Sequence, residues 1–230
     1  DVAIKIVRAE RAYDAETKAR FEREARATSA LVSPHTVTVF DFGESADGSW
    51  FLAMELLEGE SLGERLRRVT RLQVADAVRI ARQAAVSLGE AHTKGIIHRD
   101  LKPDNLFLTH VPVKSGEPEE IVKVLDFGIA KLVRGDDQHV DQLETQAGTV
   151  FGTPRYMSPE QAQGAALDAR TDVYSLAVIL YQMLAGRPPF VDDDAVVVMA
   201  CHIKDDPPRL AQVAPEARIA PAVEAVVRRA

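Results

Sequence analysis

The sequence pattern is typical of β-strands in the first quarter of the chain and of α-helices in the remainder, and this division limits the folds that the chain can adopt. Short β-branched and apolar runs predict strands in the first part, whereas apolar residues at helical spacing dominate from residue 61 onward. Strands are expected over 2–7, 36–40 and 50–55, and helices over 17–31, 61–69, 74–94 and 172–185. The last two strands flank a turn-rich stretch and should form an antiparallel hairpin. The sequence therefore predicts an α+β fold with a small β-rich lobe and a larger helical lobe.

A short segment at residues 56–59 (LLEG) joins the two expected lobes and includes a glycine, which gives the backbone freedom. We place the boundary inside this segment. The N-lobe then covers 1–57 and the C-lobe covers 58–230.

Composition excludes several classes of protein and of partner. With 46% hydrophobic and 27% charged residues, the chain is an ordinary globular sequence and not a disordered one. Its net charge of −7 argues against nucleic acid as the main partner, because phosphate-backbone binding usually rests on a basic surface. No apolar run approaches the roughly 20 residues that span a bilayer, so we expect no membrane segment in the chain. The single cysteine, Cys201, favours a reducing compartment such as the cytoplasm.

Two motifs carry most of the chemistry, namely HRDLKPDN at residues 98–105 and DFG at residues 126–128. The proline in the first motif interrupts any helix, so Asp100, Lys102 and Asn105 can point from one loop into one site. Asp126 adds a second carboxylate. Carboxylate and amide oxygens suit a Mg²⁺ ion that also binds substrate phosphates. These residues predict a metal–phosphate site with a spare carboxylate to orient a hydroxyl.

With VAIK at residues 2–5, these motifs make the chain resemble protein kinases, specifically the eukaryotic-like serine/threonine protein kinases of bacteria. The resemblance implies a two-lobed, protein-kinase-like fold. It also implies that Lys5 holds the α- and β-phosphates of ATP and pairs with Glu24 of the following helix, Glu22 being the weaker candidate. Lys5 and Asp126 should then lie close together around the nucleotide.

The same resemblance assigns roles to the remaining site residues. Asp100 would orient the attacking hydroxyl and accept its proton, and Lys102 would steady the γ-phosphate. Asn105 and Asp126 would hold the Mg²⁺ ions. The adenine contacts would come from Ala3, Met54, Glu55, Leu57 and Phe107, with Met54 as gatekeeper and Glu55 and Leu57 as hinge.

A third motif, GTPRYMSPE at residues 152–160, resembles the kinase segment that receives the substrate peptide, with Ser158 in place of the usual alanine. Thr153 and Lys102 match the serine/threonine branch. Protein substrates are therefore expected beside ATP and Mg²⁺. Asp172 matches a buried aspartate that braces the backbone of the catalytic loop.

Arg99 precedes Asp100, as in kinases whose activation loop must be phosphorylated to neutralise that arginine. Thr149 and Thr145 are the best-placed acceptors of such an autophosphorylation.

Both ends of the chain depart from the family pattern. No glycine-rich loop precedes Val2, and the apolar helical pattern at 221–230 stops abruptly. We interpret the chain as a kinase fragment, and we expect the polypeptide alone to be poorly active because phosphate-covering backbone is missing. Bacterial relatives commonly add a membrane segment and a sensor domain after the kinase, and the resemblance is compatible with dimers without specifying them.

Other interpretations stay open. The chain could be a pseudokinase or a kinase-fold binding module, or a small-molecule phosphotransferase, although the 152–160 segment counts against the latter. His98 is interpreted as a structural residue that braces Phe127. The acidic run at 192–194 is interpreted as a helix N-terminus in preference to a metal site.

Overall fold

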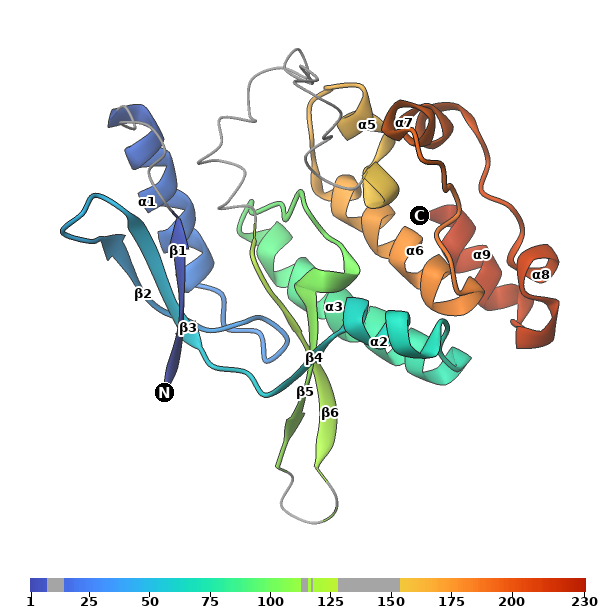
Figure 1. The fold of residues 1–230 in the computed structure, drawn as a ribbon, viewed down its shortest axis with the longest axis horizontal. Helices are drawn as coiled ribbons and strands as arrows, with labels where there is room; N and C mark the ends of the chain where they lie inside the picture. The colour runs from blue at the N-terminus through green and yellow to red at the C-terminus, as the bar shows by residue number, and fades with distance from the viewer. Residues whose placement is uncertain (8–14, 113–115, 117, 128–153) are drawn as a thin grey trace.

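The computed structural model describes residues 1–7, 15–112, 116, 118–127 and 154–230. A small sheet with one helix lies at one side, a group of helices lies at the other, and a second sheet lies between and below them (Figure 1). The expected α+β fold, with a small β-rich lobe and a larger helical lobe, is confirmed. The boundary between residues 57 and 58 stays a prediction.

The first sheet contains three antiparallel strands in the order β1-β3-β2. They are β1 (Val2–Val7), β2 (Val39–Glu44) and β3 (Trp50–Glu55). Helix α1 (Ala15–Ser29) packs against this sheet, where Phe21 stacks on Trp50 with ring centroids 4.6 Å apart. Both side chains are buried and form a small core of their own.

The strand predicted over 36–40 is wrong in position, since the structure begins β2 at Val39 and continues it to Glu44. The preceding residues bind the second sheet instead. Val37 N donates to Val124 O at 3.0 Å, and Val124 N donates to His35 O at 2.8 Å. The amide of Val37 is therefore not available to β3, and the ladder between β2 and β3 begins only near Thr38 and Val39.

A second antiparallel sheet, in the order β4-β5-β6, was not predicted. Its strands are β4 (Gly59–Ser61), β5 (Leu106–Val111) and β6 (Glu119–Val124). Strand β4 has only three residues, which is too short to recognise from periodicity, and β5 and β6 lie between the two catalytic motifs, which drew the interpretation of this region. Gly59 is required in β4, because its φ is +149° and an added Cβ would lie 2.0 Å from the Leu108 carbonyl oxygen.

The predicted helices over 61–69, 74–94 and 172–185 are confirmed as α2 (Leu62–Val69), α3 (Val74–Thr93) and α6 (Ala169–Ala185). Ser61 begins α2 with a capping box that it shares with Glu64. The shorter elements are η1 (Pro103–Asn105), η3 (Pro154–Tyr156), α5 (Pro159–Ala162), α7 (Ala195–Lys204), α8 (Leu210–Val213), η4 (Pro215–Ala217) and α9 (Pro221–Arg229).

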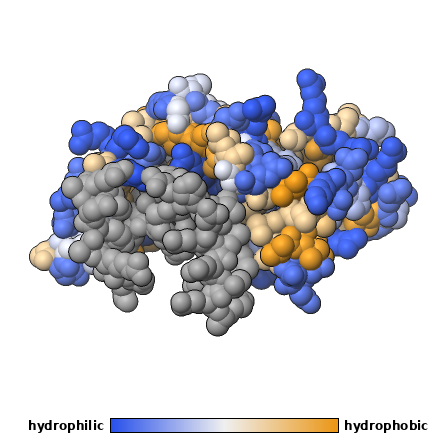
Figure 2. Space-filling view, turned by 90° about the horizontal axis from the view of Figure 1, so that it is seen from above, coloured by the Kyte–Doolittle hydropathy of each residue, from blue (hydrophilic) through white to orange (hydrophobic). Residues whose placement is uncertain are grey.

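The main core lies between α3, α6 and the second sheet, where Ile80, Leu106 and Ile179 are fully buried. The face seen from above in Figure 2 is mostly hydrophilic, with separate hydrophobic areas between the polar ones. The acidic run at 192–194 is confirmed as a helix N-terminus, because Asp194 Oδ1 accepts from Val196 N at 2.8 Å and caps α7.

Among the helices that the structure describes, none is both long and apolar enough to cross a membrane.

Phe21 should be essential to the small core of the first sheet. We expect Phe21→Ala to lower the free energy of unfolding by about 3–5 kcal/mol, because it leaves a cavity against Trp50. Urea unfolding followed by fluorescence tests this, since Trp50 is the only tryptophan of the chain. Phe40→Ala is the control, because Phe40 is 59% exposed and its loss should cost less than about 0.5 kcal/mol. Equal losses for the two variants would contradict the prediction.

Candidate active site

A buried carboxylate on α6 holds the loop that carries HRDLKPDN. Asp172 is fully buried, and its two oxygens accept from His98 N at 2.8 Å and from Arg99 N at 2.9 Å. His92 Nε2 of α3 also donates to Asp172, at 2.7 Å. The expected bracing of the catalytic-loop backbone by Asp172 is confirmed. These bonds hold Arg99 at φ +63°, a left-handed conformation that costs a non-glycine residue free energy.

The loop brings its three predicted side chains together. Lys102 Nζ lies 2.9 Å from Asp100 Oδ2, and both side chains remain about one-third exposed, at 37% and 36%. Asn105 Nδ2 donates to the backbone oxygen of Asp100 at 2.8 Å, which leaves the amide oxygen of Asn105 as the acceptor that is still available to a metal. One loop therefore brings together a partly exposed carboxylate, a partly exposed ammonium group and a buried amide.

Lys5 of β1 reaches the start of the DFG motif, far away in the sequence. Its Nζ lies 2.7 Å from Asp126 Oδ1, and each side chain is 35% exposed. Asp126 directly follows Leu125, whose N donates to Asn105 O at 2.9 Å. The expected proximity of Lys5 and Asp126 is thus present, and the two candidate metal ligands lie on neighbouring segments.

The Lys5–Glu24 pair that the resemblance implies is not formed in this structure. Glu24 lies on α1 with its Oε1 3.6 Å from Arg23 Nη2, while the ammonium group of Lys5 is engaged by Asp126. Glu24 is half-buried, whereas Glu22 is exposed. The preference for Glu24 over Glu22 as partner of Lys5 stays a prediction.

His98 has the structural position that the sequence analysis gave it. Its ring is fully buried, its centroid lies 5.0 Å from that of Phe127, and its Nε2 donates to Leu125 O at 2.8 Å. Burial lowers the pKa of His98 below its ordinary value of 6.5, so the ring is neutral at pH 7. The histidine links the catalytic loop to the strand end that carries Asp126.

The strand pairing in the two sheets shows where three of the predicted adenine contacts lie. Ala3 pairs with Met54 across β1 and β3, and Phe107 pairs with Ser61 across β4 and β5, just beyond the hinge. Leu57 is half-buried within the hinge.

Glu55 makes a contact that sequence reasoning missed. Its Oε1 accepts from Lys123 Nζ of β6 at 2.8 Å and from Thr38 N at 2.7 Å, and its own N donates to Thr38 O at 2.9 Å. Burial raises the pKa of Glu55, but the hydrogen bonds from Lys123 and Thr38 together hold it below its ordinary value. This carboxylate ties the hinge to the second sheet.

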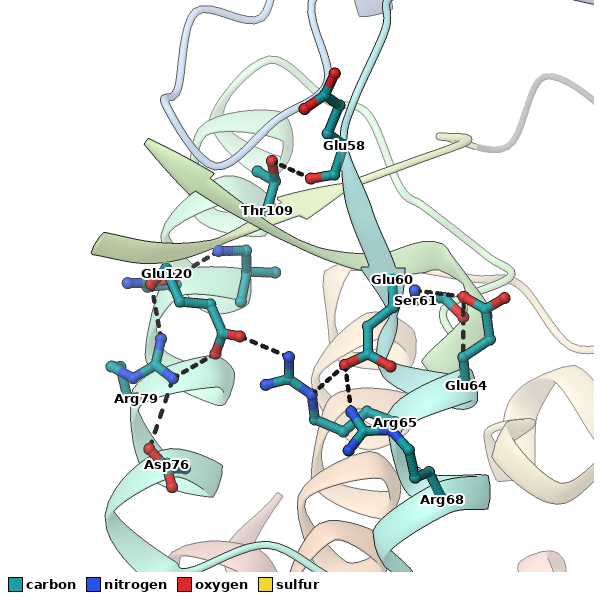
Figure 3. A network of polar contacts seen from close by, with 12 residues as sticks. Glu58, Glu60, Ser61, Glu64, Arg65, Arg68, Asp76, Arg79, Thr109 and Glu120 are labelled. Carbon is teal, nitrogen blue, oxygen red and sulfur yellow. Dashed lines mark hydrogen bonds and ion pairs between the residues drawn. The ribbon is translucent and has the colours of Figure 1, made fainter. Parts of the chain in front are cut away.

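A network of ion pairs supports the strand that follows the hinge (Figure 3). Arg65 of α2 lies between two carboxylates, with its Nε 2.8 Å from Glu60 and its Nη2 2.7 Å from Glu120. Arg79 of α3 contacts Glu120 at 2.8 Å from the other side. Thr109 Oγ1 donates to Glu58 O at 2.7 Å. The network fixes β4 to β6 and to both helices, and therefore fixes the strand carrying Phe107.

The expected peptide-docking segment, residues 152–160, is described from Pro154 to Glu160, so Gly152 and Thr153 lie outside the described residues, as do Thr145 and Thr149. Ser158 is fully buried and caps α5 in a capping box with Gln161, whose side chain donates to Arg99 O at 2.7 Å. The spacing Ser-x-x-Gln is a capping-box signal that could have revealed this contact.

In the part of the chain that the structure describes, no group of three His, Cys, Asp or Glu side chains could hold a metal ion by itself. The oxygens of Asn105 and Asp126 nevertheless fit Mg²⁺, because this ion commonly binds one or two protein ligands and completes its shell with water and substrate phosphates.

The comparisons with known proteins agree with this geometry. The protein kinase domain family matches residues 1–221. The chain belongs to this family. The two-lobed, protein-kinase-like fold is therefore confirmed.

The similar curated proteins are bacterial serine/threonine kinases. The chain is 45% identical over 229 residues to the serine/threonine-protein kinase pkn3 of Myxococcus xanthus, which covers 100% of this chain and 41% of that protein. It is 40% identical over 210 residues to the serine/threonine-protein kinase PknB of Mycobacterium leprae, which covers 90% of this chain and 32% of that protein. The chain thus spans about two fifths or less of these relatives.

Removing the Asp172 carboxylate should destabilise the catalytic loop strongly. We expect Asp172→Ala to lower the free energy of unfolding by about 3 kcal/mol or more, because it leaves two buried backbone donors without acceptors. Asp168→Ala at the start of the same helix is the matched control, since it removes an exposed N-cap and an exposed ion pair with Arg170, together worth about 1 kcal/mol. Urea unfolding measures both, and a loss for Asp172→Ala no larger than the control would disprove the bracing role.

Two buried histidines should make the protein less stable in mild acid. Burial lowers the pKa of His98, and it lowers that of His202 to about 4. Below about pH 6.5 the unfolded chain therefore binds protons that the folded chain does not. Stability should then fall with decreasing pH, by up to about 1.4 kcal/mol per pH unit for each histidine.

Urea unfolding at pH 7.5, 6.5 and 5.5 checks this dependence. The exposed His110 provides a control, because His110→Gln should leave the slope as it is in the wild type. Constant or rising stability from pH 7.5 to pH 5.5 would contradict the prediction.

Proposed function

We propose that the chain is the catalytic domain of a serine/threonine protein kinase, which transfers the γ-phosphoryl group of ATP to hydroxyl groups of proteins. The observation that supports this most directly is the 2.7 Å contact of Lys5 with Asp126, beside the loop of Asp100, Lys102 and Asn105. These are the charged and polar groups that phosphoryl transfer needs, because the protein acts chiefly by positioning and by stabilising charge.

In this proposal Asp100 accepts a hydrogen bond from the substrate hydroxyl and orients its oxygen toward the phosphorus. Lys102 lies 2.9 Å from Asp100, so its ammonium group can contact the transferred phosphoryl oxygens. Both side chains are partly exposed, which leaves them accessible to a protein substrate.

The nucleotide would bind between the two sheets. Lys5 would contact the α- and β-phosphates, with Glu24 as a further partner, and Asn105 and Asp126 would hold Mg²⁺. The ion would neutralise negative charge on the phosphates. The adenine would be bound by Ala3, Met54, Phe107 and the hinge backbone of Glu55 and Leu57.

We extend the proposal to regulation. Thr145 and Thr149 would be autophosphorylated, and Arg99 would pair with the resulting phosphate in signal transduction. Use of ATP would place this domain in the cytoplasm.

Incubation of the full-length protein with radiolabelled ATP, Mg²⁺ and a generic protein substrate tests the proposed chemistry. We expect label transfer by the wild type and at least about a 100-fold loss in Asp100→Asn and Asp126→Asn. Glu119→Gln is the control, because this exposed carboxylate of β6 lies outside the site. ATP binding without label transfer in the wild type would favour a kinase-fold binding module instead.

Phosphopeptide mapping of the active protein tests the regulatory part. We expect phosphate on Thr145 or Thr149 and its loss in the corresponding alanine variants. Active protein without phosphate on either threonine would refute autophosphorylation at these residues while leaving the transfer chemistry intact.

A further inference from the structure

A buried histidine of α7 lies behind the peptide-docking segment. His202 is only 3% exposed, and its ring is enclosed by Tyr174 of α6 and by Phe190. Both aromatic rings meet it edge to face, with centroids 5.6 Å and 5.0 Å away. The two contacts therefore fix the plane of the His202 ring.

The two ring nitrogens of His202 have different surroundings. Nδ1 lies 2.7 Å from the hydroxyl oxygen of Tyr174, and burial raises the pKa of that tyrosine to about 12, so the phenol keeps its proton. With the phenol donating to Nδ1, the neutral ring carries its proton on Nε2. Nε2 is buried and has no hydrogen-bond partner among the described residues.

Helix α7 packs against η3, the start of the described part of the docking segment. The backbone carbonyls of Arg155 and Pro154 act to raise the pKa of His202, although burial outweighs them. A buried donor without an acceptor is costly. Conformations of the segment in which one of these carbonyls reaches Nε2 are therefore favoured.

The remainder of η3 is held by other contacts. Tyr156 O accepts from Ser175 Oγ at 2.7 Å, and the Tyr156 hydroxyl donates to Gln182 Oε1 at 2.6 Å. Both partners lie on α6. The start of the segment, at Pro154 and Arg155, lies against His202 on α7.

We propose that His202 is a positioning residue for the binding of the substrate peptide. The Nε2–H group of His202 donates to the backbone at Pro154 or Arg155 and so holds the docking segment in the conformation that receives the peptide. This inference rests on the proposed protein kinase function. It predicts an effect on peptide binding but not on ATP binding, because Lys5 and Asp126 lie on other elements than α7.

A matched pair of amide variants tests the role of Nε2. His202→Gln places an amide nitrogen near the position of Nε2, whereas His202→Asn places one near Nδ1. In the full-length kinase we expect His202→Asn to raise the KM for a peptide substrate about 3- to 10-fold, with the KM for ATP unchanged. His202→Gln should stay within about twofold of the wild type. Equal KM values for the two variants, or a parallel rise in the KM for ATP, would overturn the inference.

The tautomer can be observed without any activity. In ¹⁵N-labelled protein, the ring nitrogen shifts of His202 should show a neutral ring with its proton on Nε2, and a proton on Nδ1 would overturn the inference. Tyr174→Phe, which keeps His202 itself, should weaken this preference and raise the KM for peptide. An inactive wild type with the expected tautomer would refute the proposed function alone, whereas an active wild type with the other tautomer would refute only the role of His202.

Discussion

The site depends first on the buried carboxylate of Asp172. A charged group without water must be compensated by donors, and here they are two backbone N–H groups of the catalytic loop and the ring of His92. The loop depends on the carboxylate in turn, because its two backbone N–H groups would have no hydrogen-bond acceptor without Asp172. Asp172 of α6 thereby helps to set the position of Asp100, although these two residues lie far apart in the sequence.

A second set of contacts couples the two sheets. Residues 35–37 pair with β6 through their backbone, and Glu55 binds Lys123 of the same strand. Strand β6 leads directly to Asp126, which meets Lys5 of the first sheet. The hinge, the first sheet and the Asp126 carboxylate are therefore all attached to β6, and this strand fixes their positions relative to one another.

Sequence reasoning found the residues that belong to recognisable motifs and missed those that act through long-range contacts. Lys5, Asp100 and Asp126 were identified because their neighbours form specific patterns. Neither Lys123 nor His202 belongs to a recognisable motif. In the second sheet β4 has only three residues, and β5 and β6 lie between the two catalytic motifs. The predicted hairpin is present, but its first strand begins later than expected because residues 35–37 find partners in β6.

Two residues next to the reacting groups have left-handed backbones, Arg99 at φ +63° and Asp126 at φ +57°. Each conformation costs about 1–3 kcal/mol in a residue with a side chain, and glycine would avoid most of that cost. Substitution to glycine at either position would relax the backbone and remove a charged side chain to which the proposed function gives a role. Under the proposed function, selection for thermal stability and selection for catalysis therefore favour different residues at these two positions.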